Sequence, residues 1–407
     1  GRKDARNTES GAEKKPAGRQ ESESERTETL LPRVPASWKF YASFQEDALK
    51  DGPERLLALP QEVGLLPMSM GWFLTFGEAF ACFLYYKLNL DLPVIRRKMA
   101  AFYQREYQRN YGFIRLSWCI HYNGYEKKLI QMFQEASGKR GIYIHSNMQG
   151  EIREKKNQHG LTLKHAYREY DFAAAVSGSA LESARAIAGD AAKLRLVSNC
   201  VPYQKVRERS RLPLSFQENT RCSVPEEELR RRLALPGRKF MTIGRYSKEK
   251  NHIMMLKAFS RYLAVNKEKD QDRTQLILLG GEGGLYQETC DFVEKEGLQD
   301  TVTLILSMEN PMPLLSCCDL FLLPSLYEGQ PLVLLEAEAL GVPSVATDVP
   351  GNREFMETYH GTLVPCTEEG ILSGMEAFRR GEVSVLGLDF EEWNRKALSE
   401  FLALLAD

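Results

Sequence analysis

Two acidic side chains, Glu328 and Glu336, lie with seven residues between them in a segment that is suited to bind a polar ligand. The apolar residues 319–323 precede them and predict a buried strand of a parallel sheet. Pro331 suits the first position of a helix, where its missing N–H needs no partner, and Gly341 suits the end of that helix. The segment therefore predicts a strand, a loop that carries Glu328 and a helix that carries Glu336.

The expected loop lies where ligands bind in open α/β sheets, beyond the carboxyl end of a strand. Free N–H groups at the start of the following helix would point toward such a ligand, and the helix dipole favours negative charge there. The alternative is a pair of solvated acids, one of which caps the helix. The wider sequence context favours the ligand site over this alternative.

The string EGQPLVLLE, followed by ALGVP and PGNRE, resembles the Glu-x7-Glu signature of family 4 glycosyltransferases. These are retaining enzymes of the GT-B fold (glycosyl transferases group 1), and the resemblance spans residues 239–354. It implies that Glu328 and the amides beside it hold the sugar of a nucleotide-sugar donor, and that Glu336 holds the ribose. The same resemblance adds four residues to the donor-binding set: Gly329, Gln330, Pro331 and Leu332.

A second loop, at residues 244–251, follows a predicted strand and contains two bases at the spacing of this family's diphosphate loop. By resemblance, Arg245 and Lys250 bind the donor's phosphates and stabilise the leaving diphosphate, with Gly244 at the turn. The glycine cluster that contains Gly281 is expected to approach the nucleotide. The alternative to a phosphate site is that Arg245 and Lys250 are simply basic side chains on the surface of a turn.

The first half of the chain contributes one candidate, His145, at the end of the predicted strand 141–145. Family 4 enzymes often carry a histidine at such a place, so the resemblance puts His145 near the donor sugar; a structural histidine is the alternative. Residues 113–119 predict another strand, and His159 and His165 are expected to face solvent. The catalytic set is therefore Glu328, Arg245, Lys250 and His145.

No metal and no cofactor is expected beyond the nucleotide-sugar donor, which is a substrate. GT-B enzymes commonly neutralise the departing diphosphate with side chains and helix termini. Residues 270–272, Asp-Gln-Asp, have the Asp-x-Asp spelling of metal-dependent GT-A enzymes, but they fall in a charged loop between a helix and a strand. We therefore assign them no metal.

Composition sets limits on the class of protein. A length of 407 residues allows two domains, and the net charge of −1 gives no reason to expect nucleic-acid binding. The eight cysteines are scattered without metal-binding spacing, which favours reduced thiols in the cytoplasm. No apolar run approaches the roughly 20 residues that a membrane span needs.

The most apolar stretch, residues 68–90, contains Glu78 and Lys87 and predicts a buried helix or a surface-docking element. Residues 93–110 predict a further helix with a basic side. We interpret that side as a solvated face; the alternative is contact with anionic lipid headgroups at the inner face of the membrane, or with a phosphate-rich acceptor. Its bases are Arg96, Arg97, Lys98, Arg105 and Arg109.

We expect an α/β protein of the GT-B fold, with two Rossmann-like domains facing a cleft and the first domain lacking its first strand. The expected divisions are a disordered charged tail (1–35), an acceptor-side domain (36–198), a connector (199–237), a nucleotide-sugar-binding domain (238–389) and a helix that packs back on the first domain (390–407).

The expected activity is retaining transfer of a sugar to a glycan, lipid-linked or polymer acceptor. The segment that follows His145, residues 146–177, resembles a branch of the family that makes bacterial cell-surface polymers, such as polysaccharide or teichoic-acid-like chains. One alternative is a non-catalytic nucleotide-sugar-binding or partner module of a larger polymer-synthesis protein. A GT-B epimerase is the weaker third reading.

Overall fold

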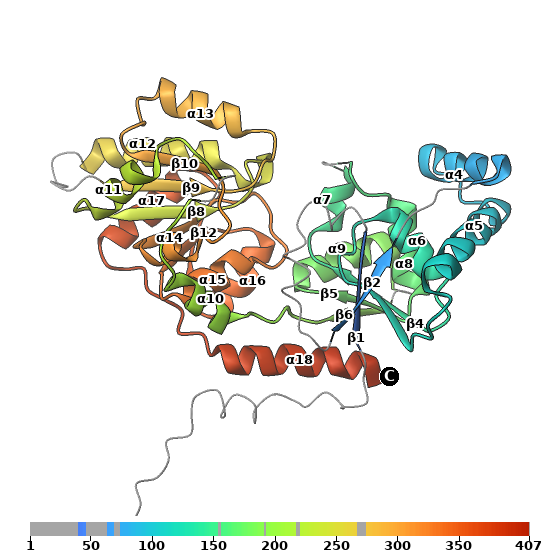
Figure 1. Cartoon of the computed structure of the whole chain (residues 1–407). Coiled ribbons are helices and arrows are strands. Elements are labelled where there is room, and N and C mark those ends of the chain that lie inside the picture. The colour runs from blue at the N-terminus through green and yellow to red at the C-terminus, as the bar shows by residue number, and fades with distance from the viewer. Residues whose placement is uncertain are drawn as a thin grey trace, which may run out of the picture.

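The computed structural model describes residues 40–45, 63–68, 74–153, 156–190, 193–216, 220–266 and 274–406. Within these ranges the strands form three sheets, of two, four and seven strands (Figure 1). The predicted tail 1–35 and the Asp-Gln-Asp segment 270–272 lie outside the described residues. The proposed domain boundaries stay predictions; below, "first domain" and "second domain" mean the elements around the four-stranded and the seven-stranded sheet.

The seven-stranded sheet has the order β13-β12-β11-β8-β9-β10-β7. Its strands are parallel except β7, which pairs with β10 in the antiparallel sense. The central strands are buried on both faces, as their continuous apolar runs predict. The strands are β7 (Arg221–Cys222), β8 (Lys239–Ile243), β9 (Gln275–Leu279), β10 (Val302–Ser307), β11 (Leu320–Leu323), β12 (Ser344–Thr347) and β13 (Thr362–Val364).

Helices cover both faces of this sheet, which is the doubly wound arrangement of α/β domains. One face carries α12 (His252–Asn266), α13 (Tyr286–Lys295) and α17 (Glu368–Arg379). The other carries α10 (Tyr203–Ser210), α14 (Met312–Ser316), α15 (Leu332–Ala339) and α16 (Pro350–Thr358). A short 3-10 helix, η1 (Lys248–Lys250), precedes α12, and α11 (Glu226–Ala234) precedes β8.

The four-stranded sheet is parallel, in the order β3-β4-β5-β6. Its strands are β3 (Trp118–His121), β4 (Lys139–Ile144), β5 (Phe172–Ala175) and β6 (Leu194–Leu196). Its helices are α4 (Phe76–Leu88), α5 (Pro93–Tyr111), α6 (Lys127–Gln134), α7 (Met148–Arg153), α8 (Gly160–Glu169) and α9 (Gly178–Ala188). Two further strands, β1 (Phe40–Gln45) and β2 (Val63–Met68), pair in parallel with each other.

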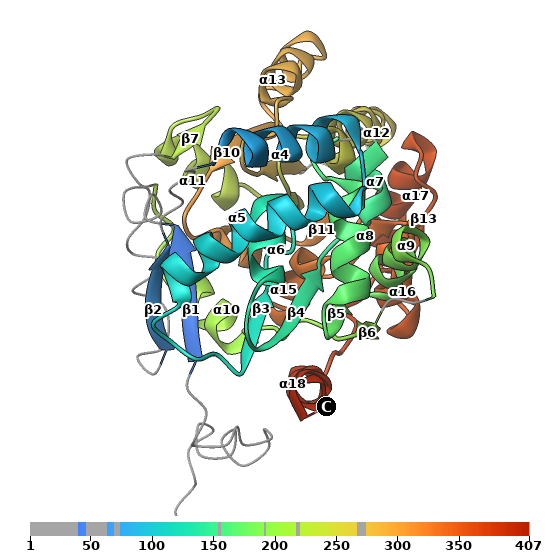
Figure 2. The same cartoon turned by 90° about the vertical axis from the view of Figure 1, so that its right-hand side faces the viewer.

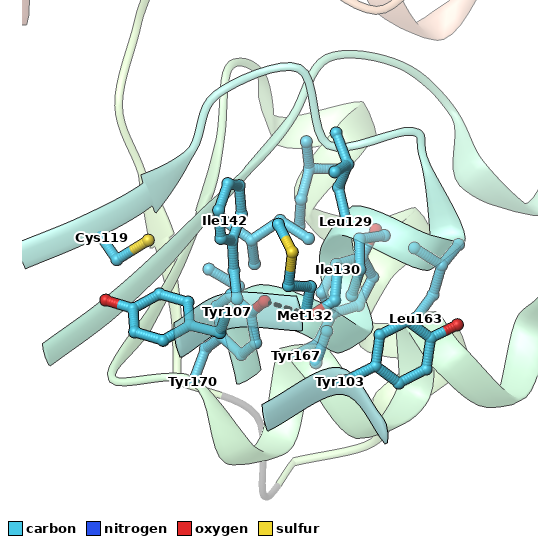
Figure 3. Close-up of a cluster of buried hydrophobic side chains, with 14 of the residues drawn as sticks. Tyr103, Tyr107, Cys119, Leu129, Ile130, Met132, Ile142, Leu163, Tyr167 and Tyr170 are labelled. Carbon is cyan, nitrogen blue, oxygen red and sulfur yellow. Dashed lines mark hydrogen bonds between the residues drawn. The ribbon is translucent and has the colours of Figure 1, made fainter. Parts of the chain in front are cut away.

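Tyrosine side chains fill much of the core beneath the first sheet (Figure 3). Tyr103, Tyr107, Tyr167 and Tyr170 are all at most 2% exposed. The hydroxyl of Tyr170 donates to the backbone carbonyl of Ile130 at 2.6 Å, which satisfies its polar end inside the core. These rings position α5, α6 and α8 against the sheet.

The last helix, α18 (Phe390–Ala406), connects the two domains (Figure 1). Phe390 at its start belongs to the apolar core of the second domain. Leu404 near its end packs with Tyr143, Phe172 and Val197 against the first sheet. The chain thus returns to the first domain after it completes the second.

The helix after the Glu328 loop differs from the prediction by one residue. Pro331 has ψ of 78° and is the N-cap, so α15 begins at Leu332. The predicted stop is confirmed: Gly341 has φ of +72°, and its N–H donates to the carbonyl of Glu338 at 3.0 Å. The next N–H, of Val342, donates to Ala337, which completes a Schellman motif.

Two sequence expectations in the first domain are wrong. The predicted strand 113–119 is shorter, since β3 begins only at Trp118. His159 does not face solvent, because it caps α8 by accepting from the N–H of Thr162 and is buried against Tyr85.

The side chain of His165 is only 13% exposed and lies between two carboxylates that raise its pKa. These two acids are Asp91 and Glu169.

Glu338 anchors the segment that leads into α18. Its buried carboxylate accepts hydrogen bonds from the backbone N–H groups of Leu386 (2.9 Å), Gly387 (2.7 Å) and Leu388 (3.2 Å). Backbone donors paired with a charged acceptor are costly to leave unpaired. This carboxylate therefore holds the crossing segment on α15.

We predict that Glu338→Ala lowers the free energy of unfolding by about 3 kcal/mol, because three backbone donors lose a buried, charged acceptor. Denaturant unfolding followed by circular dichroism measures this change. Glu294→Ala, an exposed glutamate on α13, is the control and should change stability little. Equal stability of the two variants would contradict the anchoring role.

Candidate functional site

The centre of the candidate site is an ion pair between Lys250 and Glu328. The Lys250 Nζ lies 2.6 Å from Glu328 Oε1, and the hydroxyl of Ser325 donates to the same oxygen at 2.6 Å. Only 18% of the lysine side chain and 12% of the glutamate side chain are exposed. The two loops follow β8 and β11, which are neighbouring parallel strands, so their carboxyl ends bring both residues to one edge of the sheet.

The two loops after β8 and β9 cross backbone against backbone beside this pair. A Cβ on Gly280 would lie 1.7 Å from the carbonyl oxygen of Gly244, so glycine is required there. A Cβ on Gly244 would lie 2.9 Å from Cδ of Lys250, and one on Gly281 would lie 3.8 Å from Cγ of Arg245. The structure therefore brings the predicted residues Gly244, Gly281, Arg245 and Lys250 together.

Arg245 stands apart from the buried pair. Its side chain is 62% exposed and contacts Glu249 Oε1 at 3.2 Å, within the same turn. An exposed guanidinium can pair bidentately with a phosphate group that approaches from solvent. Because Arg245 lies beside Gly281, its positive charge is close to the loops after β8 and after β9.

The loop of Glu328 touches the first domain through Gly329. A Cβ on Gly329 would lie 2.1 Å from the carbonyl oxygen of His145 and 2.9 Å from Cα of Ser146. On the opposite side, a Cβ on Gly351 would lie 2.4 Å from the carbonyl oxygen of Glu328. The predicted residues Gly329 and His145 therefore lie against each other, although they come from different domains.

Gln330 makes a second contact between the domains. Its Oε1 accepts from the backbone N–H of Asn199 at 3.1 Å and from Asn199 Nδ2 at 2.7 Å. The side-chain oxygen of Asn199 in turn accepts from the hydroxyl of Tyr122, which follows β3. Of the remaining predicted donor residues, Pro331 is buried and Leu332 is exposed at the start of α15.

His145 lies at the carboxyl end of β4 with a defined ring orientation. Its Nε2 lies 2.6 Å from the carbonyl oxygen of Tyr122, so this nitrogen carries a proton and donates it. Burial lowers the pKa of His145, although the Tyr122 carbonyl opposes that change. The neutral ring therefore leaves Nδ1 as a hydrogen-bond acceptor.

A second histidine, His121, was missed by the sequence analysis. It ends β3, the strand next to β4, and neither of its ring nitrogens has a hydrogen-bond partner in the part of the chain that the structure describes. Burial lowers its pKa to about 4, and the neighbouring His145 adds to that effect. The signal that could have found it is the same one that identified His145: a short apolar strand that ends in a histidine.

Glu336 lies inside α15, partly buried, and differs from Glu328 in having no hydrogen-bond partner among the described side chains. Burial raises the pKa of Glu336, and only the positive charge of Arg209 opposes this. A partly buried carboxylate without a donor is unfavourable for folding. Such a group is available to a ligand that brings its own donors.

Glu354, in the PGNRE string, forms a third contact between the domains. Its carboxylate accepts from the backbone N–H groups of Gly178 (2.8 Å) and Ser179 (3.3 Å) at the start of α9. The positive end of the α9 dipole favours an acid at this place. Sequence reasoning quoted the string only for its resemblance and gave no sign of this contact.

The described ranges contain no group of three or more His, Cys, Asp or Glu side chains that could hold a metal ion. Independence from metal stays a prediction, because residues 270–272 lie outside those ranges. No helix in the described part of the chain combines the length and apolar character that crossing a membrane requires.

The family model described as "Glycosyl transferases group 1" matches residues 225–377, from the residue before α11 into α17. This part of the chain is therefore similar in sequence to the group 1 glycosyl transferases. The match includes the loops of Lys250 and Glu328 and the helix α15, which carries Glu336. The matched region thus lies within the second domain described above.

Similar proteins and structures agree with this family. An uncharacterized glycosyltransferase of Methanocaldococcus jannaschii is 26% identical over 222 residues, which are 53% of this chain and 48% of that protein. A 4-alpha-N-acetylgalactosaminyltransferase of Campylobacter jejuni is 30% identical over 139 residues, 34% of this chain and 36% of that one. The matches span about half or less of these relatives' lengths.

The solved structures that resemble this chain cover most of its length. Anabaena HepE, in complex with UDP and glucose, has a TM-score of 0.58 at 14% identity, covering 90% of this chain and 89% of that one. A sucrose-phosphate synthase from Thermosynechococcus elongatus has a TM-score of 0.53 at 19% identity, covering 77% and 76%. The predicted GT-B fold is therefore confirmed.

We predict that Glu336→Gln stabilises the protein, and does so more at pH 8 than at pH 5. The raised pKa means that the folded state binds this proton more tightly than the unfolded state does, so stability is lost as pH rises through the folded value. Glutamine removes that loss. Melting temperatures at both pH values test this, with Glu338→Gln on the same helix as a control that should destabilise. A stability change of Glu336→Gln that is independent of pH would contradict the prediction.

We predict that Gly329→Ala separates or distorts the two domains, because its Cβ would lie 2.1 Å from the His145 carbonyl. Small-angle scattering should show a larger radius of gyration, or the melting temperature should fall. Gly160→Ala is the matched control, since its Cβ would meet nothing closer than 3.7 Å. Unchanged scattering and melting in Gly329→Ala would show that the domains do not meet in this way.

Proposed function

We propose that this chain transfers a sugar from a nucleotide-sugar donor to an acceptor hydroxyl, with retention at the anomeric carbon. The observation that carries this proposal is the buried Lys250–Glu328 pair at the carboxyl ends of β8 and β11. The pair combines a cation for phosphate with a carboxylate for sugar hydroxyls, and it lies within the region that matches the family. Retention is carried over from the resemblance to retaining enzymes.

The donor's diphosphate binds Arg245 and Lys250. The ammonium group of Lys250 has three donors, so it can hold Glu328 and a phosphate oxygen at the same time. The exposed guanidinium of Arg245 adds a bidentate contact from the solvent side. Two cations on one diphosphate offset the negative charge that grows as the leaving group departs, without a metal ion.

Glu328 and Glu336 bind different parts of the donor. Glu328 is fixed by Lys250 and Ser325, so its remaining oxygen presents a rigid acceptor to a hydroxyl of the transferred sugar. The carboxylate of Glu336 has no hydrogen-bond partner among the described residues and takes the ribose hydroxyls. The start of α15, with the exposed Leu332, lies between the two acids.

The reaction breaks the bond between the anomeric carbon and the diphosphate oxygen and forms a bond from that carbon to the acceptor oxygen. The acceptor's proton passes to the departing phosphate oxygen, since attack and departure share one face of the sugar. His145, neutral and with Nδ1 free to accept, orients a hydroxyl of the sugar from the first domain. The contact between Gly329 and the His145 carbonyl holds these two sides together.

For the acceptor we propose a lipid-linked or polymer glycan of the bacterial cell envelope. The Campylobacter relative's name gives a sugar on diphospho-undecaprenol as its acceptor, and so does that of a galactosyltransferase of Escherichia coli, which is 27% identical over 164 residues. We place the reaction in the cytoplasm, because all eight cysteines are free thiols.

A second candidate is a donor-binding module without transfer activity. One observation in its favour is that the sequence matches span about half or less of the relatives' lengths. Another is that the first sheet has only four described strands, while β1 and β2 pair only with each other. The two candidates share donor binding. Release of the sugar from a bound nucleotide sugar, to water or to an acceptor, separates them.

We predict that Arg245→Ala weakens binding of a nucleoside diphosphate by about 10- to 100-fold, the equivalent of one charge-assisted hydrogen bond of roughly 1.5–3 kcal/mol. Titration calorimetry with UDP, GDP, CDP and ADP measures this and identifies the base. Lys248→Ala is the control, because Lys248 is exposed on the same loop. The diphosphate site is misplaced if both variants bind with wild-type affinity, or if both lose it equally.

A further inference from the structure

Helix α4 exposes a row of aromatic side chains to solvent. Phe76, Phe80 and Phe83 are 90%, 53% and 52% exposed. Their spacing of four and three residues places them on one face of the helix. Lys87 follows on the same face one turn later.

The opposite face of α4 is already in use. Ala81 and Tyr85 are buried there in the core of the first domain, and Glu78 is held by Arg105 of α5 at 2.7 Å. A surface helix normally turns polar side chains outward, so apolar groups on both faces indicate two contact surfaces. The inner one is occupied by the protein, and the outer one is available to a partner.

Exposed apolar side chains continue beyond α4 into the turn that joins it to α5. Figures 1 and 2 both place these two helices at the end of the molecule that faces away from the second domain. The turn and the start of α5 thus extend the aromatic row across the tip of this helical hairpin. The side chains that continue it are Leu88, Leu90, Leu92 and Val94.

The hairpin is basic although the whole chain is nearly neutral. Residues 76–111 contain six Lys and Arg against three Asp and Glu, whereas the chain carries a net charge of −1. Each of the three acids is paired. Glu78 pairs with Arg105, Asp91 with Arg96 and His165, and Glu106 with Arg109.

Three cations of the hairpin have no carboxylate partner among the described residues: Lys87, Arg97 and Lys98. All three are exposed. The ammonium of Lys98 lies beside α4, since a Cβ on Gly77 would be 3.4 Å from its Nζ. Unpaired positive charge therefore borders the aromatic row at Phe76 and, through Lys87, beyond Phe83.

We propose that the outer face of the α4–α5 hairpin docks on an anionic lipid bilayer. Phenylalanine and leucine side chains enter the boundary between headgroups and acyl chains, while unpaired lysine and arginine contact lipid phosphates. A second copy of the chain is a poorer partner, because two hairpins of like charge would repel each other. The sequence analysis expected a solvated face for the five basic residues of 93–110 and left lipid contact as the alternative. The proposal adopts that alternative for Arg97 and Lys98 alone, since Arg96, Arg105 and Arg109 are held in ion pairs.

Docking would hold the first domain, which contains His145, at the surface where a lipid-linked glycan is found. The hairpin belongs to the same helical layer as α6 and α8, which pack beside β3 and β4. The membrane contact and the donor site are thus on different domains. The inference does not rest on the proposed reaction, because it uses neither the donor nor an acceptor.

Vesicle co-sedimentation of the full chain tests the proposal, with vesicles of phosphatidylcholine alone and of phosphatidylcholine mixed with phosphatidylglycerol. We expect binding to the mixed vesicles that weakens with added salt. The combined variant Phe76→Ser, Phe80→Ser and Phe83→Ser should bind at least tenfold more weakly. Lys87→Gln, Arg97→Gln and Lys98→Gln together should remove the preference for the anionic vesicles.

Phe113→Ser is the control, since Phe113 is also strongly exposed, at 74%, but lies after the end of α5. It should bind vesicles like the wild type, and circular dichroism should show every variant folded. The proposal is overturned if the wild type ignores anionic vesicles, or if the aromatic variant binds them unchanged. It is also overturned if sedimentation velocity shows a dimer in the wild type that the aromatic variant abolishes.

Discussion

The salt bridge between Lys250 and Glu328 is the interaction on which the rest of the site depends. It joins the loops after two neighbouring strands, and both partners are largely withdrawn from water. A buried charge left without its partner is costly, so neither loop can move far without the other. The shared oxygen of Glu328 is further fixed by Ser325, which leaves the carboxylate one orientation. Rigid placement of this kind lets a site meet a ligand without first reorganising.

Contacts between the domains extend this rigidity across the molecule. The backbone of Gly329 lies on that of His145, and Gln330 accepts from Asn199. Farther along the chain, the carboxylate of Glu354 accepts hydrogen bonds from the first two backbone N–H groups of α9. All three contacts come from the segment that begins at Glu328 and ends with PGNRE, so one stretch of sequence serves both the donor site and the domain interface.

Local patterns predicted most of the fold and the membership of the site, but not its contacts. The predicted helix 93–110 and the predicted strand 319–323 each differ from α5 and β11 by one residue, because apolar runs and clear end signals define them. The bases and acids of the two loops were predicted, yet the pairing of Lys250 with Glu328 was not, since residues 78 positions apart share no local signal. The same reason hid the contact of Glu354 with α9. The burial of His159 was missed because it depends on the rings of α4, which tertiary packing brings to it.

The return of α18 to the first sheet has a consequence for biosynthesis. Tyr143, Phe172 and Val197 are translated long before Leu404, which covers them. At roughly 5–20 residues per second, that face of the sheet stays uncovered for on the order of 10–50 s during translation. The first domain therefore cannot finish folding as it leaves the ribosome, and a chain interrupted within the second domain exposes an apolar face that chaperones and proteases recognise.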